Sequence, residues 1–316
     1  MIESRGLTKR YGTLTALEGL TLDIGPGQIF GFIGPNGAGK STTMKILACL
    51  LKPDAGRASV CGLDIGTRGD DIRRVIGYMP DFLGVYDDLT VDEYLQFFAA
   101  AFQIERARRR VIVDQVLELT DLTPKKHALV DSLSRGMQQR LGVARVLIHD
   151  PKVLLLDEPA SGLDPRARIE MRSLLVELGK MGKTLMVSSH ILSELAEMCT
   201  SIGIIERGKL LYAGSIQDAY AKTRQAGHGE RIAVRLEREG VGADAAKARL
   251  ETDARVARVE ADAANRTLAV ELTAGEHGHH FVIEALVGAG ARIAAFQPED
   301  VKLEDAFLKL TTGALQ

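Results

Sequence analysis

A glycine-rich segment between Gly34 and Ser41 reads GPNGAGKS and fits the spacing GxxxxGK[ST]. Glycines let backbone N–H groups surround phosphate oxygens, and a lysine at this position reaches the β- and γ-phosphates of a nucleotide. A serine hydroxyl next to the lysine can ligate Mg²⁺. The residues expected to line the phosphates are Gly34, Pro35, Asn36, Gly37, Ala38, Gly39, Lys40, Ser41 and Thr42.

Two adjacent carboxylates, Asp157 and Glu158, follow the apolar run Val153–Leu156 and precede a proline. Ligands of open parallel sheets bind beyond the carboxyl ends of strands, and charges next to a buried strand are costly unless they are used. We therefore predict that Asp157 holds Mg²⁺ and that Glu158 orients and deprotonates an attacking water. The alternative, a simple acidic cap on the strand, is weakened by the nearby phosphate loop.

Apolar periodicity predicts the strands and helices that would position these groups. Strands are expected at Ala16–Ile24, Gln28–Ile33, Val153–Leu156, Thr184–Ser189, Ser201–Ile205 and Lys209–Tyr212. Helices are expected at Lys40–Leu50 and Arg166–Met181. The phosphate loop thus has a strand before it and a helix after it, which argues against a chance glycine-rich turn. The alternation of strands and helices favours an α/β fold with a mostly parallel sheet and helices on its faces.

The segment from about residue 87 to residue 150 is predicted to be a mainly helical subdomain, with apolar faces around Tyr94 and Val113. Its basic run Arg106–Arg110 is short, and the whole chain has a formal net charge of -2. Because a nucleic-acid site usually needs a basic stripe, we interpret the run as a solvated helix face and expect no nucleic-acid partner. The three scattered cysteines are expected to be reduced thiols rather than a redox or metal site.

A polar segment at residues 223–230 is predicted to be a linker between residues 1–222 and residues 231–316. The second part is expected to be a small α+β domain with the ferredoxin-like order βαββαβ. Its expected elements are Ile232–Leu236, Ala243–Leu250, Val256–Glu260, Thr267–Leu272, His279–Ala289 and Arg292–Phe296, followed by a last helix, Leu303–Leu310. The imidazoles of His277, His279 and His280 are of metal-ligand type, but a surface helix start is the favoured interpretation because no second ligand group is near.

Three more motifs follow the phosphate loop in order: LSRGMQQR at Leu133–Arg140, SGLD at Ser161–Asp164, and His190 directly after a predicted strand. Together with the phosphate loop and Asp157-Glu158-Pro159, they strongly resemble the ATP-binding-cassette (ABC) ATPases over residues 1 to about 220. The resemblance implies a P-loop core whose mixed sheet has an antiparallel part. It also implies hydrolysis of ATP with Mg²⁺ by two copies of the chain, bound head to tail around two ATP molecules.

The resemblance assigns expected roles to single residues. Tyr11 resembles the aromatic residue that stacks on adenine, and His190 resembles the histidine that contacts the γ-phosphate. Ser134 and Gly136 resemble the signature donors that touch the γ-phosphate of an ATP held by the other subunit. Asp164 resembles the residue that links the two sites across the dimer. The expected catalytic residues are Glu158, His190 and Lys40.

Three features depart from the usual family pattern. Arg135 and Met137 replace a glycine and the glutamine of the signature LSGGQ, which keeps the backbone donors but loses side-chain contacts at Met137. Asp81 stands where the family has a glutamine; a carboxylate can still ligate Mg²⁺, but it adds negative charge near the phosphates. The third departure is the additional segment Arg231–Gln316.

The LSRGM signature, Asp81 and the Leu303–Leu310 helix together resemble the ATPase subunits of ABC-2-type exporters, which export drugs, antibiotics, lipids and polysaccharides. The N-terminus has no apolar signal region, and no uncharged apolar run reaches about 20 residues. We therefore expect a cytoplasmic protein that reaches the inner face of the cell membrane through a membrane-spanning permease. An importer ATPase and a regulatory cassette without turnover are the alternatives. Regulatory cassettes commonly lose the lysine, glutamate or histidine that this chain keeps at Lys40, Glu158 and His190.

Overall fold

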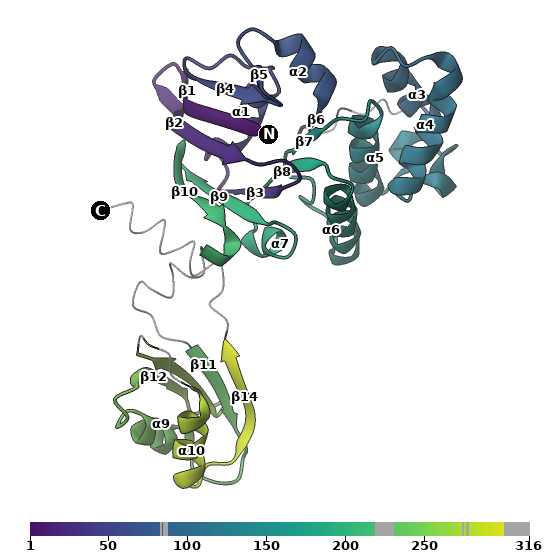
Figure 1. Ribbon diagram of the computed structural model, residues 1–316. Helices are drawn as coiled ribbons and strands as arrows, with labels where there is room; N and C mark the ends of the chain where they lie inside the picture. The colour runs from purple at the N-terminus through teal and green to yellow at the C-terminus, as the bar shows by residue number, and fades with distance from the viewer. Residues whose placement is uncertain (83, 85–87, 219–230, 274, 276–277, 300–316) are drawn as a thin grey trace. The chain divides into compact units, whose positions relative to one another are not determined.

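The computed structural model describes residues 1–82, 84, 88–218, 231–273, 275 and 278–299, and the chain divides into two compact units between Ile216 and Gln217. Each unit has its own sheet structure (Figure 1). Each unit also has its own cluster of buried apolar side chains. The predicted linker at residues 223–230, the predicted helix Leu303–Leu310 and His277 lie outside the described residues.

The first unit is built on a six-stranded sheet in the order β10-β9-β3-β8-β7-β6. Its strands are β3 (Ile29–Ile33), β6 (Ile76–Met79), β7 (Val153–Leu156), β8 (Thr184–Ser189), β9 (Ser201–Glu206) and β10 (Lys209–Ser215). Neighbouring strands are parallel, apart from the antiparallel pair β9 and β10. Every residue of β3, β7 and β8 is buried, as expected for strands covered on both faces. The carboxyl ends of these three strands therefore lie at the same edge of the sheet.

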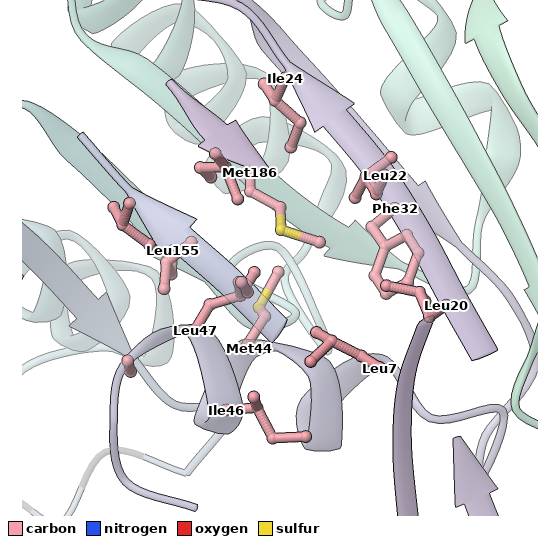
Figure 2. Close-up of a cluster of buried hydrophobic side chains, with 14 of the residues drawn as sticks. Leu7, Leu20, Leu22, Ile24, Phe32, Met44, Ile46, Leu47, Leu155 and Met186 are labelled. Atoms are coloured by element: carbon pink, nitrogen blue, oxygen red, sulfur yellow. The ribbon is translucent and has the colours of Figure 1, made fainter. Parts of the chain in front are cut away.

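A four-stranded antiparallel sheet in the order β2-β1-β4-β5 completes the predicted mixed architecture. Its strands are β1 (Ile2–Tyr11), β2 (Leu14–Ile24), β4 (Ala55–Val60) and β5 (Leu63–Asp64). Side chains from both sheets meet helix α1 (Lys40–Leu47) in one buried cluster, in which Figure 2 shows Leu20, Phe32, Met44 and Met186 together. Burial of the apolar side of α1 fixes the helix that begins at Lys40.

Helix α1 and strands β1 and β4 differ from the sequence prediction. Helix α1 ends at Leu47 rather than Leu50, because Cys49 takes a φ of +57°, a left-handed conformation of the kind that ends helices. The apolar pattern predicts neither β1 nor β4. Along β1, register shifts such as the one between Ser4 and Leu7 interrupt the alternation of buried and exposed residues.

The predicted helical segment contains α3 (Val91–Ala101), α4 (Arg106–Leu119), α5 (Arg135–Leu147) and the short 3₁₀ helices η1 (Thr123–Lys125) and η2 (Val130–Ser132). Thr90 and Glu93 form a capping box that starts α3. Figure 1 shows α3 and α4 on the side of the unit away from the antiparallel sheet. Arg106, Arg108 and Arg110 are exposed on α4, as expected for a solvated face. The other helices of this unit with both ends among the described residues are α2 (Gly69–Val75), α6 (Pro165–Lys180) and α7 (Leu192–Ala196).

The second unit has its elements in the order strand, helix, strand, strand, helix, strand, which is the order expected from the sequence. They are β11 (Arg231–Leu236), α9 (Ala243–Leu250), β12 (Val256–Asp262), β13 (Thr267–Leu272), α10 (His280–Gly288) and β14 (Ile293–Glu299). The strands form an antiparallel sheet in the order β12-β13-β11-β14, and Val234, Leu250, Val270 and Leu286 belong to the core between sheet and helices. Across both units, none of the described helices is long and apolar enough to cross a membrane.

Candidate nucleotide site

The phosphate loop joins β3 to α1 and takes backbone conformations that favour glycine. Gly39, the N-cap of α1, has a φ of +109°, and a Cβ atom there would lie 2.6 Å from the carbonyl oxygen of Ala16. A Cβ atom at Gly34 would lie 2.2 Å from the carbonyl oxygen of Ile205. Gly37 has a φ of +81° and nothing within 4 Å of a Cβ position. Packing thus requires glycine at the two ends of the loop, while its middle leaves room for a ligand.

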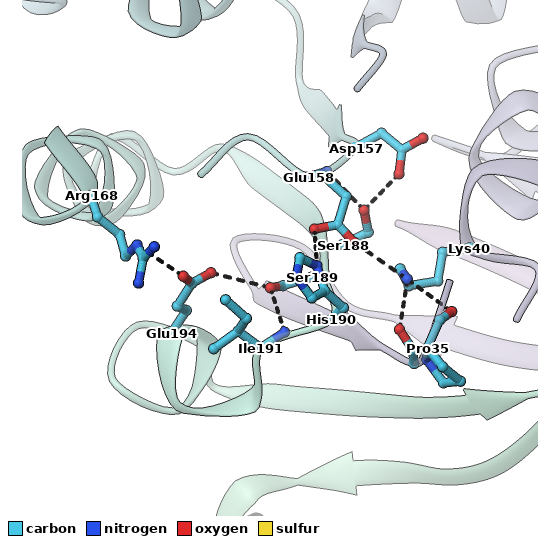
Figure 3. A network of polar contacts seen from close by, with 11 residues as sticks. Pro35, Lys40, Asp157, Glu158, Arg168, Ser188, Ser189, His190, Ile191 and Glu194 are labelled. Atoms are coloured by element: carbon cyan, nitrogen blue, oxygen red, sulfur yellow. Dashed lines mark hydrogen bonds and ion pairs between the residues drawn. The ribbon is translucent and has the colours of Figure 1, made fainter. Parts of the chain in front are cut away.

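Lys40 is the first residue of α1, and its ammonium group turns back toward the loop. Its Nζ donates to the carbonyl oxygens of Gly34 at 2.6 Å and of Pro35 at 3.2 Å (Figure 3). Gly39 offers no side chain to cap the helix, and the first turn carries no acidic residue. The N–H groups and the positive end of α1 are therefore oriented to receive an anion. Ser41 and Thr42 follow in this turn and are half-buried.

Asp157 and Glu158 follow β7 and are held by Ser188 near the end of β8. The Ser188 hydroxyl donates to Asp157 Oδ1 at 2.6 Å and accepts from the backbone N–H of Glu158 at 2.9 Å. Asp157 is buried, and Glu158 has a φ of +51°, in the left-handed region. Such a conformation costs a non-glycine residue about 1–3 kcal/mol and is concentrated at functional sites. It turns the chain directly after the strand.

The Glu158 carboxylate lies between a cation and an imidazole. Its Oε1 is 3.3 Å from Lys40 Nζ, and its Oε2 is 2.9 Å from His190 Nδ1 (Figure 3). The Glu158 side chain is 11% exposed, whereas that of His190 is 41% exposed. This arrangement places a group that can accept a proton between two groups that can contact phosphate oxygens.

Asp81 lies two residues beyond β6, the neighbour of β7 in the sheet. Burial, followed by the negative charges of Asp157 and Glu158, raises the pKa of the Asp81 carboxyl group, and the Arg135 guanidinium opposes this shift. Burial, followed by the negative charges of Asp157 and Asp81, raises the pKa of Tyr78 to about 12. Asp81 and the Asp157-Glu158 pair, predicted from two separate motifs, therefore interact electrostatically in the folded chain.

Ser41, Asp81 and Asp157 are the residues expected to hold Mg²⁺. Within the described ranges, no group of three or more His, Cys, Asp or Glu side chains is arranged to hold a metal by itself. Mg²⁺ is usually bound through one or two carboxylates together with phosphate oxygens of a substrate. The Ser41 hydroxyl at the start of α1 and the Asp157 carboxylate beyond β7 fit that chemistry.

The signature segment and the SGLD segment lie side by side within the chain. Ser134 caps α5, since its hydroxyl accepts from the backbone N–H of Met137 at 3.4 Å. Asp164 caps α6, since its carboxylate accepts from the N–H of Ala167 at 2.9 Å. A Cβ atom on Gly136 would lie only 2.7 Å from Ala167 Cβ, so a glycine is needed where the two helix starts meet.

Two further predicted or unusual residues lie at the surface. The guanidinium of Arg135 lies against Gly162, where a Cβ atom would be 2.6 Å from Arg135 Cζ. Tyr11 ends β1 and is 47% exposed, with Lys9 Nζ 5.7 Å from its ring centroid. Part of this ring is thus accessible to a stacking partner.

Sequence reasoning missed four polar residues around the site: Arg168, Ser188, Ser189 and Glu194. The two serines end β8 directly before His190, so paired hydroxyls at a buried strand end were an available signal. Arg168 and Glu194 had no local signal, because each finds its partner on another helix, with Nε and Oε1 3.0 Å apart.

Comparison with known proteins agrees with this geometry. Residues 17–161 match the family model described as ABC transporter. The Nod factor export ATP-binding protein I of Burkholderia orbicola is 40% identical over 214 residues, which cover 68% of this chain and 70% of the relative. The protein of the same name from Ralstonia nicotianae is also 40% identical, over 68% of this chain and 67% of the relative.

Solved structures agree as well. An ATP-binding subunit of an ABC transporter matches with a TM-score of 0.64 at 28% identity, over 71% of this chain and 93% of the solved chain. A dimeric ATP-binding cassette in a post-hydrolysis state, bound to ADP and Pi, matches with a TM-score of 0.62 at 26% identity, over 68% of this chain and 99% of the solved chain. The chain therefore belongs to the ABC transporter family, as an ATP-binding subunit that hydrolyses ATP.

Proposed function

We propose that this chain drives a membrane exporter of the ABC-2 type. Two copies would bind head to tail around two ATP molecules and attach to a membrane-spanning permease at the inner face of the cell membrane. The observation that most supports a working motor is the placement of Glu158 between Lys40 and His190 at the carboxyl edge of the central sheet. Export is supported by the relatives, which are named for Nod factor export.

Glu158 is the general base of this proposal, because its carboxylate is held by the sheet edge and can accept a proton from water. Lys40 would exchange its contacts with the loop carbonyls for the β- and γ-phosphates, and His190 would contact the γ-phosphate. Ser41, Asp157 and Asp81 would hold Mg²⁺, which supplies neutralisation of the phosphate charge.

The remaining residues act across the proposed dimer. Ser134 and Gly136 lie at the start of α5. Backbone N–H groups there can donate to the γ-phosphate of an ATP molecule held by the second copy. Asp164 begins α6 beside them and would link the two sites, while Tyr11 would stack on adenine. The cargo belongs to the drug, antibiotic, lipid or polysaccharide classes and is selected by the permease.

Direction of transport can be measured in proteoliposomes. The tagged chain is purified with its permease from detergent-solubilised membranes and reconstituted with the cassettes facing the outer solution. We expect added ATP to drive a cargo from one of the four classes into the lumen, because the lumen then corresponds to the cell exterior. ATP-dependent loss of preloaded cargo from the lumen would instead identify an importer. Liposomes carrying the Glu158→Gln variant are the matched control and should transport nothing.

A further inference from the structure

A chain of polar contacts links the start of α6 to the loop that carries His190 (Figure 3). Arg168, on α6, donates from Nη2 to the carbonyl oxygen of Leu163 at 3.2 Å, and its Nε lies 3.0 Å from Glu194 Oε1. Glu194, on α7, accepts through Oε2 from the Ser189 hydroxyl at 3.2 Å. The SGLD segment and the end of β8 are thus connected through one ion pair.

The chain of contacts continues on both sides of His190. The Ser189 hydroxyl accepts from the backbone N–H of Ile191 at 2.9 Å, so one oxygen ties together the residues before and after the histidine. The Ser189 carbonyl also accepts from the N–H of Gly34 at 3.4 Å, which joins this loop to the phosphate loop. The histidine itself is held at its ring, by Glu158 at 2.9 Å.

The two paired atoms are buried, although the arginine side chain reaches solvent. The Glu194 side chain is 12% exposed and the Arg168 side chain is 39% exposed, while Glu194 Oε1 and Arg168 Nε are both shielded from solvent. Removing one charge leaves the other without the partner that its shielded atom now contacts. A cavity of about 70 Å³ borders this pair and also Glu158 and Ser189, which leaves space for the loop to shift once the pair is broken.

We propose that Arg168 and Glu194 are positioning residues for ATP hydrolysis. They hold His190 beside Glu158 and make that placement depend on the position of Leu163 and the neighbouring Asp164. This inference rests on the proposed roles of Glu158 and His190. It adds two residues that would act through His190 rather than by contacting the phosphates or the attacking water.

The chain supplies a matched control on the same two elements. Arg172 and Glu197 form a second ion pair between α6 and the end of α7, one helical turn beyond Arg168 and Glu194. This control pair joins the same helices and has no hydrogen bond to Ser189 or Ile191 among the described contacts.

The test compares steady-state ATP hydrolysis of Glu194→Gln and Glu197→Gln. We expect Glu194→Gln to lower kcat about 10-fold while KM changes less than about 2-fold, as for other residues that orient a functional side chain. Glu197→Gln should keep both constants within about 2-fold. Wild-type kcat in Glu194→Gln, or an equal loss in both variants, would overturn the proposal.

A double-mutant cycle separates positioning from general destabilisation. In a His190→Ala background, Glu194→Gln should cost less than about 2-fold in kcat, because the residue that it positions is gone. A further 10-fold loss in that background would show that Glu194 acts independently of His190 and would overturn the proposal. If His190→Ala alone keeps wild-type turnover, the proposed function of His190 fails first, and the inference fails with it.

A second variant covers the possibility that loss of the carboxylate prevents folding. Ser189→Ala breaks the same chain of contacts without leaving a charge unpaired. It should also lower kcat several-fold with little change in KM, and this loss should likewise vanish in the His190→Ala background. Unchanged kcat in folded Ser189→Ala would contradict the proposed path.

Discussion

Polar side chains are buried in one unit of the molecule and left at the surface in the other. In the first unit, the described structure buries ten polar or charged residues, among them Lys40, Asp157, Ser188 and Ser189. Among the described residues of the second unit, no polar or charged residue is buried. Its charged residues form surface pairs instead, such as Arg292 with Glu239.

This difference indicates where the chemistry is located. Burying a charge costs several kcal/mol unless a partner or a function compensates for it, whereas surface ion pairs contribute about 0–1 kcal/mol. In the first unit the buried charges of Lys40 and Asp157 lie where β3, β7 and β8 end, beside the phosphate loop, whereas the buried Arg140 on α5 is paired with Asp121 and Glu170. The second unit needs only its apolar core to fold, so charge substitutions there should leave hydrolysis unchanged.

The largest effect is expected from removing the charge of Glu158. Glu158→Gln should lower kcat by about 10²–10⁴-fold, because the proposed general base is lost while the side chain keeps its shape. ATP binding, measured with a fluorescent ATP analogue, should be retained. The control in the second unit is Glu239→Gln, which should hydrolyse ATP at the wild-type rate; equal losses in both variants would break the comparison.

A core substitution in the second unit should have the opposite profile. Leu268 is 1% exposed in β13, so Leu268→Ala should destabilise this unit by about 2–5 kcal/mol through lost burial and a cavity. Turnover in the first unit should stay at the wild-type level. Urea unfolding combined with limited proteolysis measures the first effect, and an ATPase assay measures the second. As a control, Glu260→Gln changes an exposed residue on the adjacent strand β12. It should alter the free energy of unfolding by less than about 0.5 kcal/mol. A loss of turnover in Leu268→Ala would show that the units are coupled.

The smallest effect is expected at Asp81. Because burial and the nearby carboxylates raise its pKa above the ordinary 3.8, the ionised form of Asp81 disfavours the folded state. Asp81→Asn should therefore stabilise the chain near neutral pH, by less than about 1 kcal/mol, because Asp81 is only partly desolvated and most of its surface is exposed to solvent, which screens the charges. The gain should shrink as pH falls toward the ordinary pKa, where Asp81 is protonated in both folded and unfolded chains. Melting temperatures of both proteins between about pH 4 and pH 7 give the test. A stability gain of Asp81→Asn that grows as the pH falls would contradict the raised pKa of Asp81.

Local signals predicted the parts of the site that are contiguous in sequence. Strands β7 and β8 have the predicted bounds, because each is an uninterrupted buried run that ends at a charged or polar residue. The phosphate loop was predicted from its GxxxxGK[ST] spacing, and the Asp157-Glu158 pair from its position directly after an apolar run. By contrast, β1 escaped prediction because its register shifts break the alternation on which strand prediction depends.

Partnerships between distant residues could not be predicted from the sequence. The bond from Ser188 to Asp157 spans 31 residues, and the contact between Arg168 and Glu194 joins two helices. Such pairs depend on how the fold brings distant strand ends and helices together. No short stretch of sequence contains that information. Asp164 is a different case, since an aspartate directly before a proline that begins a helix is a recognisable N-cap.

The central claim is that two copies of this chain close around ATP and that Glu158 then hydrolyses it. The most direct measurement is the molar mass of Glu158→Gln by light scattering, with and without ATP, alongside turnover by the wild type. We predict a monomer without ATP, a doubling of mass with ATP, and steady hydrolysis by the wild type alone. A variant that binds ATP yet stays monomeric, or that hydrolyses ATP at the wild-type rate, would contradict the account.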